Sequence, residues 1–140
     1  MRQFADDRGS VLLLIVGMTA LALALIVGVM DASSLYLERK RLFTIADGAA
    51  LVAAQSFDAA LPPIQGRPRL SDASVARATA DYLRHLTPAA LHSVTIGSSN
   101  TPDEKTAVVE MNAVWHPPIV SVFMPQGIQL AVTARARTIY

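Results

Sequence analysis

The chain lacks the residues and spacings on which most catalytic and metal-binding sites are built. Its 140 residues contain no cysteine, so neither a disulfide framework nor a thiolate metal site can form. The histidines, His85, His92 and His116, match none of the usual metal-ligand spacings. The sequence also has no nucleophile elbow and no glycine-rich phosphate loop. We therefore expect no catalytic residues, no metal, no cofactor and no enzymatic activity.

The chain also lacks a strong charge of either sign. Its formal net charge is +1, and no basic stripe stands out beyond "ERKR", Glu38 to Arg41. A nucleic-acid partner is therefore not expected, because such partners require a basic surface. The short basic cluster is either a solvated helix turn or a contact with lipid headgroups. No internal repeat or low-complexity segment is present.

Charge is missing altogether from one long segment, Ser10 to Met30. Its 21 residues include no charged residue, Asn, Gln or His, within a chain of mean hydropathy +0.38. As a helix this segment would be about 31 Å long, which matches the hydrocarbon core of a bilayer. Its Leu, Ile and Val residues together favour insertion by roughly 4 to 7 kcal/mol. The sequence therefore predicts a transmembrane segment over residues 10–30, behind a head of residues 1–9.

A secretory signal peptide is the alternative reading of this N-terminus. Ala20-Leu21-Ala22 and Ala22-Leu23-Ala24 have the form of a cleavage site, but apolar sequence continues past both to Met30. Cleavage there would leave an apolar N-terminus, so retention is favoured. The basic residues on the two sides of the segment are nearly balanced in number. The short head favours a cytoplasmic N-terminus and an external C-terminal region.

The helical pattern continues beyond the apolar segment. Apolar and small residues recur at helical spacing along one stripe: Leu35, Leu42, Ile45, Ala49, Val52 and Ser56. We predict one helix from about Ser10 to Ala60, amphipathic over residues 31–61 and ended by Pro62-Pro63.

Residues 62–140 predict a small α+β domain. Ser71 is the expected N-cap of a second helix that runs to about Leu86. Beyond it the period changes to two, which predicts strands over 92–98, 105–115 and 127–140, with a turn over 99–104. Residues 119–127 are either a short strand or a turn of helix. A three-stranded antiparallel sheet needs a partner, so its apolar side should pack on the amphipathic half of the long helix. The fold class is thus α+β, membrane-anchored, with a long N-terminal helix.

Five residues are candidates for contacts between helices. Ala20, Ala24 and Gly28 recur four residues apart, a spacing of small residues that lets membrane helices approach closely. Asp31 directly follows the apolar segment, and Asp47 lies in the alanine-rich stretch "TIADGAALVAA". For Asp47, a helix contact and simple exposure to solvent are both open.

Residues 8–57 resemble the Tad domain of TadE/TadG-like proteins of Flp (tight adherence) pilus assembly. The matching positions are Gly9, Asp31, Arg41 and the block "DGAALVAA" that begins at Asp47. The resemblance implies a pilin-like protein of the bacterial cytoplasmic membrane, single-pass, with its N-terminus inside and its domain outside. The implied partners are other pilin-like subunits or pilus assembly proteins.

The resemblance also makes Gly9-Ser10 a possible prepilin-type cleavage site. Such substrates usually carry glutamate at the fifth residue after the cut, and here that residue is Leu14. We therefore expect an uncleaved assembly protein or a minor subunit, not a repeating major pilin.

Our hypothesis is a pilin-like accessory or minor subunit of Flp/Tad-type (type IVc-like) pilus assembly or secretion, acting by protein–protein interaction. A membrane-tethered ligand-binding or sensory domain unrelated to pili is the alternative. A secreted or anchored hydrolase is a third hypothesis, for which the sequence shows no cluster of polar residues.

Overall fold

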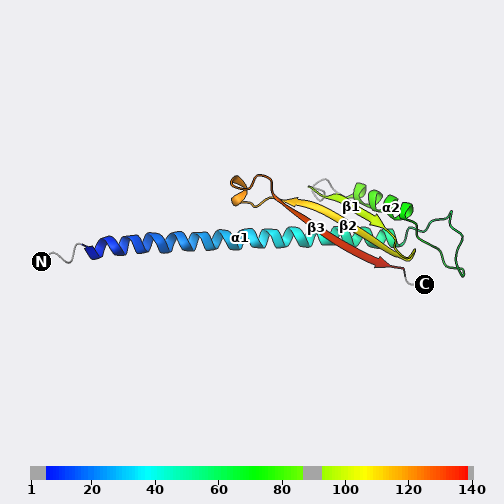
Figure 1. The fold of residues 1–140 in the computed structure, drawn as a ribbon, viewed down its shortest axis with the longest axis horizontal. Helices are drawn as coiled ribbons and strands as arrows, with labels where there is room; N and C mark the ends of the chain where they lie inside the picture. Colours follow the sequence, from blue (N-terminus) through cyan, green and yellow to red (C-terminus); the bar gives the residue numbers. More distant parts are fainter. Residues whose placement is uncertain (1–5, 87–92, 139–140) are drawn as a thin grey trace.

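One long helix carries a small domain at its C-terminal end (Figure 1). The computed structural model describes residues 6–86 and 93–138. Helix α1 spans Asp6–Ala54, and helix α2 spans Asp72–His85. The strands are β1 (Thr95–Asn100), β2 (Thr106–Trp115) and β3 (Ile128–Arg137), with a 3-10 turn η1 (Val120–Val122) between β2 and β3. The predicted α+β fold is confirmed.

The strands form an antiparallel sheet in the order β1-β2-β3. The β2–β3 register is unbroken from Thr106 opposite Arg137 to Trp115 opposite Ile128. On β2, buried and half-buried residues alternate along the whole strand, as expected for a strand with one face on the core. The predicted face of Ala107, Val109, Met111, Ala113 and Trp115 is the buried one.

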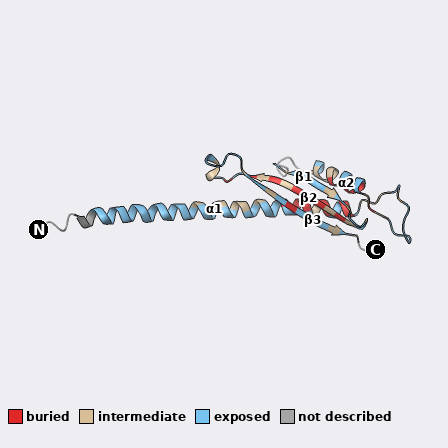
Figure 2. Cartoon of the chain, viewed as in Figure 1, coloured by how far each residue is buried: buried red, intermediate tan, exposed pale blue. Residues whose placement is uncertain are grey.

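This face packs on the second half of α1, as predicted. Small side chains dominate the helix side of the contact: Ala46, Ala49, Ala50 and Ala53 are fully buried, together with Leu42. Helix α2 packs on α1 and β1 and, through Val75, completes one hydrophobic cluster that also includes Leu70 of the preceding segment. Figure 2 shows the buried residues concentrated where the sheet crosses α1. The core thus includes the C-terminal part of α1 and excludes its N-terminal part.

Helix α2 begins as the sequence predicts. The Ser71 hydroxyl accepts a hydrogen bond from Ser74 N at 3.1 Å, and Ser74 Oγ accepts one from Ser71 N at 3.1 Å. This reciprocal pair is a capping box in which serine takes the place of the usual glutamate.

The predicted end of α1 is wrong. The helix stops at Ala54 and does not reach Ala60, because tertiary contacts take over its last groups before the prolines. The Thr138 hydroxyl donates to Ala54 O at 2.7 Å, and Asp58 N donates to Arg69 O at 3.0 Å. Phe57 turns toward the core and packs against it.

The first strand is shifted relative to the prediction. It runs to Asn100, so Ser99 lies in β1 and not in a turn. Thr101 N donates to Asp72 Oδ1 at 2.7 Å, which ties the end of the strand to the start of α2. His92, which began the predicted strand, lies outside the described residues. Residues 119–127, left open above, contain the short η1 turn and no strand.

Candidate interaction surface

The N-terminal half of α1 stands free of the domain (Figures 1 and 2). Its most apolar 18-residue window has a mean hydropathy of 2.8, and none of that window is buried. Leu13 is 78% exposed and Val29 is 66% exposed. A helix packed in the core of a soluble protein would bury such residues. By length and composition α1 can cross a membrane, and it fits a membrane anchor.

The candidate residues on this half have no contact with the domain. Gly9 and Ser10 are helical and exposed, and a Cβ added at Gly9 would meet nothing within 4 Å. Ala20, Ala24 and Gly28 are exposed in the same way. Neither cleavage at Gly9 nor packing through the small-residue stripe is tested by this arrangement, and both stay predictions.

The two candidate acids lie in different environments. Asp47 is exposed on α1 and points away from the core. Asp31 is half-buried, and its Oδ1 is shielded from solvent with no hydrogen-bond partner among the described residues.

The glycine beside Asp47 makes the close contact that the sequence left open. A Cβ added at Gly48 would clash with the Tyr82 hydroxyl and would lie 3.0 Å from Tyr82 Cζ. Ala49 and Ala50 next to it are fully buried. Gly48, Ala49 and Ala50 therefore belong to the packing surface of α1 for α2 and the sheet, whereas Asp47 does not. The signal of this surface in the sequence was Gly48, which is the one glycine between residues 31 and 61.

The opposite face of the C-terminal half of α1 is uncovered and mixes large apolar side chains with the exposed Lys40, Thr44 and Asp47. Four large side chains on it are more than half exposed: Tyr36 at 66%, Leu37 at 63%, Phe43 at 51% and Leu51 at 57%. We call these four residues the outer face. Asp47 lies among them, since residues four apart share one side of a helix. Exposed aromatic and aliphatic side chains at this spacing are typical of a surface that binds another helix.

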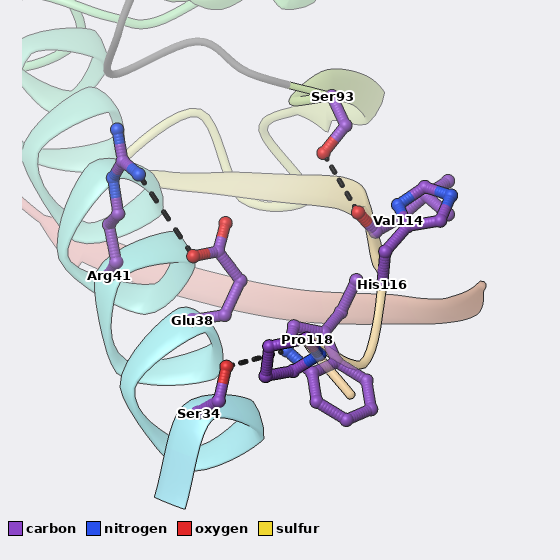
Figure 3. A pocket seen from close by; sticks show the side chains of 8 residues that line it. Ser34, Glu38, Arg41, Ser93, Val114, His116 and Pro118 are labelled. Carbon is purple, nitrogen blue, oxygen red and sulfur yellow. Dashed lines mark hydrogen bonds and ion pairs between the residues drawn. The ribbon is translucent and has the colours of Figure 1, made fainter. Parts of the chain in front are cut away.

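A groove opens where α1 meets the end of the sheet (Figure 3). It has a volume of about 600 Å³ and is lined by Ser34, Glu38, Arg41, Ser93, Val114, Trp115, His116 and Pro118. Trp115 Nε1 donates to Ser34 Oγ at 3.2 Å, which fixes the end of β2 on the helix. Glu38 and Arg41 form a loose ion pair at 4.0 Å along the helix.

The described residues offer no arrangement for metal chemistry. Across residues 6–86 and 93–138, no group of three His, Cys, Asp or Glu side chains could hold a metal ion. His85 Nδ1 lies 2.7 Å from Asp81 O in its own helix, and His116 is exposed at the edge of the groove.

Two carboxylates have lowered pKa values, and both act in turns of the domain. The Ser71 hydroxyl donates to Asp58 Oδ2 at 2.7 Å and, with a hydrogen bond from Ala60 N, holds the pKa of Asp58 below its ordinary value of 3.8. Burial would raise the pKa of Asp103, but hydrogen bonds from Lys105 N and from Thr106 together lower it. These are structural groups, since each stabilises a loop through its ionised form.

The free apolar helix and the packed domain together define an α+β protein with a candidate membrane anchor. Residues 9–56 match the Tad family (TadE/G-like Flp pilus assembly). This confirms the resemblance predicted over residues 8–57. The match covers α1 from Gly9 onward and ends two residues past its last turn, so α2 and the sheet lie outside it. Searches of curated proteins and of solved structures gave no match. The Tad match associates the chain with Flp-type pilus assembly.

Proposed function

We propose that the protein is a pilin-like accessory or minor subunit of Flp/Tad-type pilus assembly or secretion. Residues 10–30 anchor it in the bacterial cytoplasmic membrane, with the head inside and the domain outside. It works by binding other pilin-like subunits or assembly proteins, without catalysis.

The observation that carries this proposal is the outer face of α1. After the domain has packed, Tyr36, Leu37, Phe43 and Leu51 are still more than half exposed on a helix whose family match ends at residue 56. The domain uses the alanine side of the helix and leaves this side for a partner. Burying side chains of this size in a contact is worth about 1.5–3 kcal/mol each, which is enough to select a partner helix.

Co-purification of detergent-solubilised protein with Tad assembly components tests the proposal. Phe43→Glu with Leu51→Glu should abolish the complex while the circular-dichroism spectrum and membrane level stay unchanged. Ile64→Glu is the matched control, because Ile64 is a similarly exposed apolar residue, at 55%, on a distant loop. An intact complex in the Phe43/Leu51 variant would contradict the proposed role of the outer face.

The small-residue stripe gives a second contact within the membrane. Ala24→Leu adds bulk where a partner backbone would approach, yet leucine favours insertion. Membrane level should therefore stay normal while the complex is weakened, and Leu23→Ile should change neither. If Ala24→Leu and Gly28→Leu both leave the complex unchanged, the contact lies outside the membrane.

The N-terminus of the purified protein decides between an accessory protein and a processed pilin. We expect residues 1–9 to be retained, because Leu14 stands where processed pilins carry glutamate. That glutamate would offset the new α-ammonium in an apolar bundle. Intact-mass measurement shows which form exists. Loss of residues 1–9 that depends on Gly9 would replace our proposal with a processed subunit.

One observation favours a different function. The groove between Glu38, Trp115 and His116 could hold a small ligand, which would suit a membrane-tethered binding or sensory domain. Genes for a secretion ATPase and an inner-membrane platform beside this one would support pilus assembly. Their absence would favour the binding domain.

A further inference from the structure

The two ends of the sheet differ sharply in charge. At one end, the turn between β1 and β2 carries Asp103, Glu104 and Lys105, with Arg137 of β3 next to them. At the other end, no Asp, Glu, Lys or Arg occurs anywhere between Glu110 and Arg135. The connection between β2 and β3, residues 116–127, is the centre of this uncharged stretch, and we call it the β2–β3 loop.

The β2–β3 loop exposes large apolar side chains to an unusual degree. Val122 is 83% exposed and Phe123 is 84% exposed, and Ile119 and Met124 are exposed by more than 40%. Isolated exposed apolar residues are common, but a contiguous uncharged cluster marks a contact surface.

Backbone hydrogen bonds within the β2–β3 loop hold it in one conformation. Ser121 N donates to Pro117 O at 3.1 Å, Phe123 N donates to Val120 O at 2.9 Å, and Gly127 N donates to Met124 O at 3.2 Å. Gly127 has a φ of 66°, a conformation that side chains rarely adopt, and a Cβ there would lie 2.7 Å from Trp115 O. The exposed tip is therefore presented by a fixed turn.

The position of the loop along α1 shows what it faces. Its base is fixed where Trp115 donates to Ser34, which is four residues past Met30 and so about 6 Å along the helix axis. Figure 1 shows η1 beside α1, reaching from this point toward the N-terminus of the helix. Val27 and Asp31, four residues apart, are the half-buried residues in an otherwise exposed stretch from residue 9 to residue 33. The loop therefore reaches the level of the last turns of the apolar segment.

We infer that the tip of the β2–β3 loop, centred on Val122 and Phe123, inserts into the external leaflet of the membrane that α1 crosses. The headgroup layer is about 5–8 Å thick on each side of the hydrocarbon core. A base about 6 Å above Met30 with a tip directed back toward Val27 places these side chains at the boundary between headgroups and acyl chains. The occupant is lipid, because the cluster is uncharged and lies beside α1 at the level of its exposed apolar segment.

Such a second contact fixes how the domain stands on the membrane. A single helix leaves a domain free to rotate and lean, whereas a helix and a loop define one orientation. The charged end of the sheet, at Lys105, is then directed away from the bilayer. The outer face of α1 lies on another side of the helix and stays accessible.

The test uses the full-length chain in nanodiscs, since the absence of native cysteine allows single-site labelling. An environment-sensitive nitrobenzoxadiazole probe is placed at Val122→Cys, with controls at Leu23→Cys in the span and Lys105→Cys at the far end. Lipids with spin labels on the upper acyl chain should quench the Val122 and Leu23 probes and leave the Lys105 probe unchanged. The Val122 emission should be shifted to the blue relative to that of Lys105.

The inference rests on the proposed membrane anchor, and the controls separate the two. A quenched Leu23 probe with an unquenched Val122 probe overturns the loop contact alone. An unquenched Leu23 probe overturns both. A blue-shifted Val122 probe that lipid does not quench, and that cross-links to a second protein, shows a protein partner at the loop and also overturns the lipid assignment.

Discussion

The two halves of α1 use the same small and apolar residues in opposite ways. In residues 10–30 every leucine is more than half exposed, and alanines such as Ala22 and Ala24 are uncovered. In residues 42–54 the alanines are buried together with Leu42 and Ile45, and Leu51 and Phe43 are exposed. In the first half the apolar surface stays exposed and fits a membrane anchor, whereas in the second half the small residues let a sheet and a helix approach closely.

The largest expected effect is the loss of membrane insertion when charges are placed in the first half of α1, residues 10–30. Leu21→Arg with Leu23→Arg places two charges at the middle of the span, at a cost of about 2.5–3.5 kcal/mol each. Together they cost about 5–7 kcal/mol and so cancel the favourable insertion energy of roughly 4 to 7 kcal/mol. The double variant should move from the membrane pellet to the soluble fraction after alkaline carbonate washing. Phe43→Arg with Leu51→Arg, on the second half, should remain in the pellet. Retention of the Leu21/Leu23 variant in the membrane would contradict the anchor.

Replacing alanine by leucine should affect domain stability differently in the two halves of α1. Ala46 is fully buried, so Ala46→Leu overpacks the core and should lower the free energy of unfolding of the domain by about 1–3 kcal/mol. Ala22 is exposed on the first half, and Ala22→Leu should leave domain stability unchanged. Thermal unfolding in detergent, followed by near-ultraviolet circular dichroism, measures both. Equal stability of the two variants would show that the sheet does not pack on α1 as described.

The glycines of the two halves give a finer contrast. Gly28→Ala meets nothing within 4 Å, whereas Gly48→Ala meets the Tyr82 ring. Replacing glycine by alanine in a helix normally gains about 1 kcal/mol. At Gly48 the clash should reverse this gain and destabilise the domain by about 1 kcal/mol, within the usual range for overpacking. In a Tyr82→Ala background the same change should become stabilising. A double-mutant cycle with no coupling between positions 48 and 82 would contradict the contact.

The smallest expected effect is the pH dependence of the stability of the domain. Because the pKa of Asp58 is lowered, its ionised form contributes stability above the ordinary pKa of 3.8, and this contribution is lost as the pH falls through the lower folded-state value. Asp58→Asn should therefore be less stable than the native chain at neutral pH, with the difference shrinking below about pH 3.8. Urea titrations at several pH values measure it. A difference that grows on acidification would contradict the Ser71–Asp58 hydrogen bond.

Local patterns in the sequence were sufficient for the elements themselves. The helix through residues 10–30, the Ser71 cap and the alternation on β2 each depend on neighbours along the chain, and each is found where predicted. The match of residues 9–56 to the Tad family likewise lies within one continuous segment, which contains the block "DGAALVAA".

Contacts between residues far apart in the sequence decided the end of α1, the role of Gly48 and the position of the β2–β3 loop. Helix α1 ends at Ala54, whose carbonyl accepts a hydrogen bond from the hydroxyl of Thr138, 84 residues away. The role of Gly48 depends on Tyr82, and the position of the β2–β3 loop depends on the bond between Trp115 and Ser34. Such contacts have no periodic signature, since their energy depends on which surfaces the folded chain brings together. The sequence by itself determined which segments are apolar, helical or extended, and only the tertiary structure decided which apolar side chains remain exposed.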